Sequence, residues 1–126
     1  MKTTEKKGTI IKLVFNVPDE ELNYILSGCF EGGSNYWIGN VQVKNNEYLG
    51  ATYTSEVPAA GGVILITEDC NEVGCEVVVH ELDKRKLLVG IIKYGEEMKT
   101  LNFDEMDAGD YDLILQYALF KEQKYC

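Results

Sequence analysis

The chain has 126 residues, 45% of them hydrophobic, and its 21 acidic and 12 basic residues give a net charge of −9. This length predicts one domain with one hydrophobic core. The negative charge disfavours direct binding to nucleic acid or to an anionic membrane, because both need a basic surface. Neither a secretion signal nor an apolar stretch long enough to span a membrane is evident, so we expect a cytoplasmic protein.

The first predicted elements are a strand and a helix, which follow a flexible segment, residues 1–7. Residues 8–16, GTIIKLVFN, are rich in β-branched and aromatic side chains, which favours a strand. A helix is expected next, because Pro18 and Asp19 suit a helix N-terminus. Its apolar residues have helical spacing: Leu22, Ile25, Leu26, Cys29 and Phe30. The glycines at 32–33 are expected to end this helix.

The middle of the chain predicts further strands separated by turns. Residues 36–44, YWIGNVQVK, alternate apolar and polar side chains, as in a half-buried strand. Residues 48–57 are expected to form the next strand. Residues 62–68 and 75–82 then form two strong strands that are expected to pair as a hairpin.

Two helices are predicted to follow the strands. Asp83 is expected to cap the first, which runs to about Tyr94. An acidic loop at residues 96–108 leads to the last helix, residues 108–120, with the sequence AGDYDLILQYALF. This helix is apolar nearly all round, so it should be central or be covered by a second copy, which favours a homodimer.

The order of these elements predicts an α+β fold. An antiparallel sheet of about four to five strands is expected to be covered on one face by the early helix and the two C-terminal helices. All of them fall in a single domain, residues 8–126, with no internal repeat or linker.

The residues offer little for catalysis or metal binding. The cysteines, Cys29, Cys70, Cys75 and Cys126, lack CxxC spacing, so we expect reduced thiols and no zinc site. His80 is the one histidine of the sequence, and GxSxG, HExxH and P-loop motifs do not occur. The sequence therefore predicts a protein without enzymatic activity, catalytic residues, cofactor or metal.

Three motifs resemble a small protein family of phages, prophages and conjugative elements of Gram-positive bacteria. They are EGGSNYW (31–37), YLGATYTSEVPAAGG (48–62) and YDLILQYALF (111–120). The resemblance runs from about residue 8 to the C-terminus and implies a mobile-element accessory protein that counteracts host defence. Ala59-Ala60 and Lys121 depart from the family pattern, which often has an arginine and usually a glycine there.

A run of carboxylates is the first candidate site. The residues are Glu96, Glu97, Asp104, Glu105, Asp107, Asp110 and Asp112. The plain interpretation is a solvated loop and helix start, because acidic residues favour helix N-termini. The functional hypothesis is a phosphate-like surface that occupies the basic channel of a host defence protein such as a nuclease effector, as in an anti-CRISPR inhibitor.

The glycine-rich segments are an alternative ligand site. The residues are Glu31, Gly32, Gly33, Tyr36, Trp37, Tyr53, Glu56, Gly61 and Gly62. Aromatic rings stack on nucleobases, and glycine N–H groups approach phosphates, so the protein could sequester a nucleotide immune signal. The plain interpretation is a helix end followed by core aromatics, and the one arginine, Arg85, lies on another element. A structural or assembly role is the third hypothesis.

Overall fold

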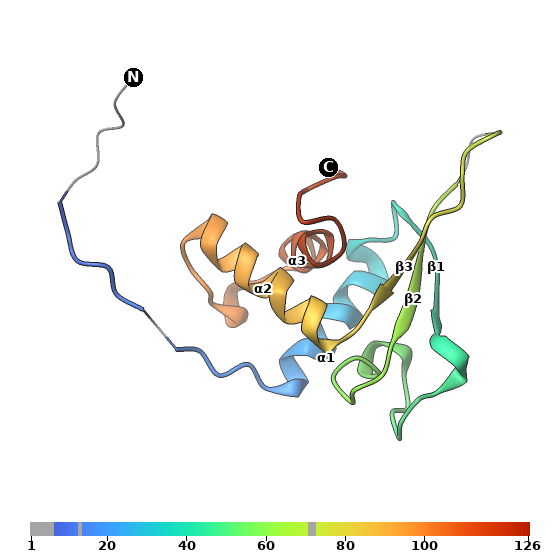
Figure 1. The fold of residues 1–126 in the computed structure, drawn as a ribbon, viewed down its shortest axis with the longest axis horizontal. Coiled ribbons are helices and arrows are strands. Elements are labelled where there is room, and N and C mark those ends of the chain that lie inside the picture. The colour runs from blue at the N-terminus through green and yellow to red at the C-terminus, as the bar shows by residue number, and fades with distance from the viewer. Residues whose placement is uncertain (1–6, 13, 71–72) are drawn as a thin grey trace.

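The computed structural model describes residues 7–12, 14–70 and 73–126, and this part of the chain holds three α-helices and one three-stranded sheet. The helices are α1 (Asp19–Gly28), α2 (Lys84–Met98) and α3 (Ala108–Phe120). The strands are β1 (Ile38–Val43), β2 (Ile64–Glu68) and β3 (Val79–Leu82). The helices gather on one side of the molecule and the sheet on the other (Figure 1). The α+β class is confirmed, whereas the described sheet has fewer strands than predicted.

The sheet is antiparallel throughout, in the order β1-β2-β3. The central strand places Ile66 opposite Val41 of β1 and His80 of β3. Ile64, Ile66 and Glu68 form its buried face, because side chains alternate across a strand. The predicted hairpin is confirmed, with shorter strands than the sequence indicates.

The first predicted strand is wrong in the part of 8–16 that is described. Residues 7–12 and 14–17 run as an extended segment outside the sheet, and we call them the N-terminal arm (Figure 1). Leu13, which falls within the predicted strand, lies outside the described residues. Residues 1–6, which are most of the predicted flexible segment, also lie outside them. A β-rich composition produces a strand only where another strand offers hydrogen bonds, and the arm meets none.

The strand predicted at residues 48–57 is also wrong. Leu49 and Gly50 have φ angles of 53° and 87°, which turn the chain out of the extended conformation. The Glu56 carboxylate then accepts hydrogen bonds from the backbone N–H groups of Thr52 and Tyr53. The segment therefore forms a short 3₁₀ helix, Thr54–Glu56, instead of a strand.

For α2, the predicted start agrees with the structure, whereas the predicted end does not. The Asp83 carboxylate accepts from the N–H of Lys86, so the predicted cap of α2 is confirmed. The helix passes through Gly95 and ends at Met98, beyond the predicted end, and Lys99 follows with a φ of 58°. None of the helices in the described ranges has the length and apolar character needed to cross a membrane.

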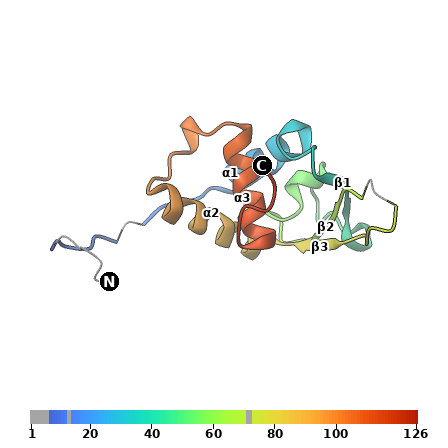
Figure 2. The ribbon, with the colours of Figure 1, turned by 90° about the horizontal axis from the view of Figure 1, so that it is seen from above.

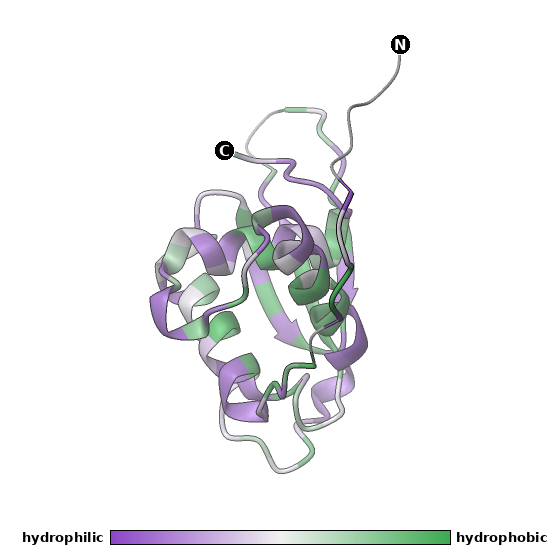
Figure 3. Ribbon diagram, turned by 90° about the vertical axis from the view of Figure 1, so that its left-hand side faces the viewer, coloured by the Kyte–Doolittle hydropathy of each residue, from purple (hydrophilic) through white to green (hydrophobic). Residues whose placement is uncertain are grey.

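Helix α3 is the centre of the core. It contacts α1, α2 and β3, so its nearly continuous apolar surface is covered within one chain (Figure 2). Ile114, Leu115 and Ala118 are among its buried residues. Hydrophobic segments of neighbouring helices face one another, and hydrophilic segments lie toward the outside (Figure 3). The apolar girth of α3 therefore no longer supports a homodimer through this helix.

Two of the four cysteines are paired in a disulfide and two are free thiols. Cys70 and Cys75 form a disulfide, with Cα atoms 6.1 Å apart, so the prediction of reduced thiols is wrong for this pair. Cys29 is a free, buried thiol and Cys126 a free, exposed one. Burial raises the pKa of Cys29 to about 12, which keeps it protonated and unreactive.

Candidate functional site

The stretch EGGSNYW is anchored to α3 by one buried carboxylate, Asp112. Its Oδ1 accepts hydrogen bonds from Ser34 Oγ at 2.6 Å and from Trp37 Nε1 at 2.7 Å. Its Oδ2 accepts from Tyr36 Oη at 2.5 Å and from Gln116 Nε2 at 3.0 Å. Among the described residues this carboxylate has no cationic partner. The four donors supply the hydrogen bonds that a buried carboxylate needs.

This geometry corrects two predictions from the sequence. Asp112 is only 6% exposed, so it cannot belong to an acidic binding surface. Trp37 is 1% exposed, so its ring is not open to a stacking ligand in this conformation. Burial and the hydrogen bond to Asp112 raise the pKa of Tyr36 to about 12, so its hydroxyl serves as a donor at neutral pH. The plain interpretation as a core aromatic therefore holds for Trp37, whereas Tyr36 is bonded to Asp112 but is 51% exposed.

Of the two glycines after α1, Gly33 packs closely against the start of α3. After α1 the chain continues through a π-helical turn, Cys29–Gly33, so the helical segment ends where the sequence predicts. A Cβ on Gly33 would lie 2.7 Å from the carbonyl oxygen of Ala108, so only glycine permits this approach to the start of α3. Glu31 and Gly32 are exposed and make no such contact.

The C-terminal tail, residues 121–126, is held over the Trp37 ring by Gln116. The Gln116 Oε1 atom accepts from the backbone N–H groups of Lys124 and Tyr125, each at 2.8 Å. Its Nε2 atom also donates to the carbonyl oxygen of Tyr125 at 3.2 Å. One buried amide thus fixes the backbone of a segment that has no regular structure.

Glu68 is the second buried carboxylate of this region, and like the Asp112–Gln116 pair it is linked to the C-terminal tail. Its carboxylate accepts from Lys124 Nζ at 2.7 Å, from His80 Nε2 at 2.8 Å and from the Tyr125 hydroxyl. Burial alone would raise the pKa of Glu68, but these three donors outweigh it and lower the pKa to about 2. A carboxylate stays charged here because the tail and β3 surround it with donors.

His80 is used structurally. Besides its contact with Glu68, its ring packs edge-on against Phe120, with centroids 5.0 Å apart. In the described part of the chain no serine, threonine or cysteine side chain hydrogen-bonds to it, so it has no nucleophile to activate there. His80 is therefore a residue of β3 whose contacts serve packing and hydrogen bonding.

The remaining carboxylates of the acidic run lie in sequence from the end of α2 to the first turn of α3 (Figure 1). Three of them have a local partner. Asp107 and Asp110 form a reciprocal capping box at the start of α3, and Asp110 also accepts from the Tyr94 hydroxyl at 2.8 Å. Glu97 pairs with Lys93 at 3.2 Å.

The other three acids are free of such partners. Glu96, Asp104 and Glu105 are exposed, and none of them forms an ion pair within the described ranges. Asp104 and Glu105 belong to a short 3₁₀ helix, Phe103–Glu105, in which the N–H of Asp104 donates to the side chain of Asn102. Four of the seven carboxylates of this run therefore have partners within the chain, and three are solvated and accessible to another protein.

The nine residues of the alternative ligand site do not surround one cavity. A polar cavity of about 340 Å³ lies between the 48–62 segment and α1, and only Glu56 of the nine lines it. Asp19 also lines it, and no lysine or arginine does, so a phosphate would meet negative charge. Tyr53 is exposed, and Gly61 has a φ of 100°, which suits a turn. A Cβ on Gly62 would lie 2.5 Å from Val57, so this glycine serves packing.

The polar network around the tail was not anticipated from the sequence. Asp112 and Gln116 are four residues apart and interrupt the apolar part of α3, residues 111–120. This spacing places them on one face of the helix, and it is the signal that indicates a buried polar pair. No comparable pattern marks Glu68 or Tyr125. In the described residues no group of three histidine, cysteine or carboxylate side chains is arranged to hold a metal ion.

Comparison with known proteins returns no matching family model, no matching curated protein and no matching solved structure.

Proposed function

We propose that this chain is a noncatalytic, cytoplasmic accessory protein of a phage or mobile element, and that it blocks a host defence protein by direct contact. The observation that carries this proposal is the set of unpaired carboxylates, Glu96, Asp104 and Glu105, at one end of the helical layer. The motif resemblance supplies the biological setting. The partner is a basic protein surface such as the nucleic-acid channel of a nuclease effector.

The physical basis is replacement of phosphates by carboxylates. A nucleic-acid channel gains affinity by exchanging counterions for backbone phosphates, and a rigid array of carboxylates gains in the same way. The array is held by regular structure on both sides, the end of α2 and the capping box of α3. The chain's net charge of −9 adds long-range attraction, which raises the association rate with a basic partner.

Two charge-matched variants test this mechanism. The first is the triple substitution Glu96→Gln, Asp104→Asn and Glu105→Gln, which removes only the unpaired acids of the run. The control is the triple Glu20→Gln, Glu76→Gln and Glu122→Gln, which removes exposed acids elsewhere. Both triples lower the negative charge equally, so any difference between them reports position rather than total charge.

The measurement has two stages. Tagged protein is purified from a host that carries several defence systems, and co-purifying proteins are identified by mass spectrometry. Inhibition of the captured effector is then titrated with wild type and both triples. We expect the first triple to inhibit at least about tenfold more weakly, as loss of several phosphate-like contacts implies, and the control to match wild type. Equal inhibition by all three proteins would dispose of charge mimicry.

The nucleotide hypothesis keeps less support. The Trp37 ring is covered by Tyr125, and neither lysine nor arginine lines the cavity beside Glu56. Isothermal titration with cyclic and ADP-ribose-derived nucleotides tests it directly. Binding that survives the acidic triple but is lost in Trp37→Phe would favour sequestration of a nucleotide over contact with a protein.

A further inference from the structure

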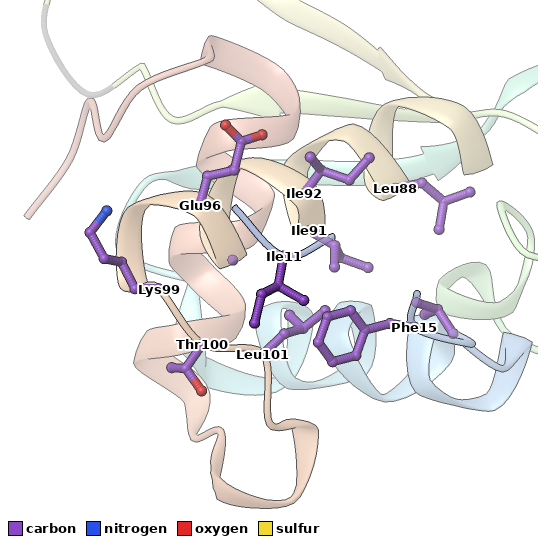
Figure 4. A pocket seen from close by; sticks show the side chains of 11 residues that line it. Ile11, Phe15, Leu88, Ile91, Ile92, Glu96, Lys99, Thr100 and Leu101 are labelled. Carbon is purple, nitrogen blue, oxygen red and sulfur yellow. The ribbon is translucent and has the colours of Figure 1, made fainter. Parts of the chain in front are cut away.

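An apolar groove runs between the N-terminal arm and α2. Its volume is about 630 Å³, and Ile11 and Phe15 of the arm form one wall (Figure 4). Leu88 and Ile92 of α2 form the other, and Leu101 also lines the groove. The groove thus remains open after the chain has placed its own arm beside α2.

The arm is apolar on two faces, and the chain covers at most one of them. Ile11 and Phe15 line the groove and are 78% and 51% exposed, and Ile10 and Val14 are 89% and 99% exposed. Neighbouring side chains of an extended chain point to opposite sides, so Ile10 points away from Ile11 and Val14 away from Phe15. An extended segment that is apolar on both sides is typical of burial between two partners, so we infer that one cover of the arm is missing.

We propose that the missing cover is a second copy of this chain. Two arms pair antiparallel about a twofold axis, and Ile10 and Val14 of each arm enter the groove of the other copy. Such an interface is self-complementary, since each copy supplies both an arm and a groove. It also satisfies the backbone of the arm, which makes no backbone hydrogen bond before Pro18 in the described ranges.

Charge favours a second copy as the occupant. Residues 1–17 hold four lysines and one glutamate, a net charge of +3, while the rest of the chain carries −12, and together they give the −9 of the whole. Glu96 and Lys99 both line the groove, so the attraction comes from the acidic body as a whole and not from the groove lining. The basic arm of a second copy is therefore attracted to the acidic body of the first. This dimer does not depend on the proposed function.

The solution mass of the full chain tests the pairing. We expect sedimentation equilibrium to give twice the 14.2 kDa of one chain for wild type. The double variant Ile10→Lys with Val14→Lys should sediment as a single chain with an unchanged circular dichroism spectrum, because both positions are exposed within one copy. The control, Val73→Lys with Val77→Lys, adds the same charge at exposed positions of the hairpin and should remain dimeric.

A mixing experiment locates the contact. Chains carrying Val14→Cys are mixed with chains carrying Ile92→Cys, both with Cys126→Ser, and oxidised. The expected product is a disulfide between the two different chains. Three results would each overturn the proposal: a wild type that sediments as one chain at its highest soluble concentration, a dimer that Ile10→Lys with Val14→Lys leaves intact, or no cross-link in the mixture.

Discussion

Tyr125 lies flat on Trp37, with ring centroids 5.4 Å apart and ring planes 7° from parallel. The residue next to the C-terminus thus covers the one tryptophan of the chain. This stacking, together with the bonds of the tail to Gln116 and Glu68, makes the tail part of the core rather than a loose end.

Removing the Tyr125 ring should expose Trp37. We expect Tyr125→Ala to lower the free energy of unfolding by about 1–3 kcal/mol and to shift the tryptophan emission of the folded protein to longer wavelength. Fluorescence spectra and urea denaturation measure both effects. The variant Glu122→Ala changes an exposed residue of the same tail and should leave both unchanged. An unshifted spectrum in Tyr125→Ala would mean that the tail does not cover the indole in solution.

Asp112 should be among the most sensitive positions of the chain. Asp112→Ala leaves the donors of Ser34, Trp37 and Tyr36 without an acceptor, so we expect a loss of about 3 kcal/mol or more. Asp112→Asn keeps one acceptor oxygen and should cost less. Asp104→Asn, at an exposed acid, is the control and should stay within about 0.5 kcal/mol of wild type. Urea denaturation orders the four proteins, and an Asp112→Ala variant as stable as the control would contradict this role.

The contact between α2 and α3 predicts opposite effects at two glycines of one helix. A Cβ on Gly90 would lie 2.6 Å from the carbonyl oxygen of Ile114, so Gly90→Ala should force the helices apart and cost about 1–3 kcal/mol. Gly95 has no neighbour closer than 3.9 Å, so Gly95→Ala should stabilise the protein by about 0.5–1 kcal/mol through helix propensity. Thermal unfolding compares them, and equal effects would mean that this close approach is absent.

Acid stability should depend on Glu68. Its pKa is lowered from 4.5 to about 2 in the folded protein, so its charged form is favoured by folding. The contribution is fully present above pH 4.5 and is lost as the pH falls toward 2, by up to about 3 kcal/mol. Glu68→Gln cannot titrate, so the stability gap between wild type and this variant should narrow over that range in urea denaturation. A gap that is constant with pH would show that the pKa is not lowered.

Much of the fold follows from local sequence signals. The amphipathic spacing of α1, the Asp83 cap and the paired strands around residues 64–82 all depend on residues close together in the chain, and the structure contains them. The prediction of a strand at residues 48–57 was wrong because the Glu56 carboxylate accepts hydrogen bonds from nearby backbone N–H groups. The composition of the segment carries no sign of that competition.

The sequence by itself determined the α+β class, the amphipathic helices and the acidic run, because propensity, periodicity and charge are properties of neighbouring residues. Only the tertiary structure decided which acids are free and which are buried. Asp112 belongs to the same run as Glu105, yet the fold surrounds it with donors from residues 34–37, more than seventy positions away. Burial and hydrogen bonding arise from contacts between distant segments, and these decide whether a carboxylate serves the core or faces a partner.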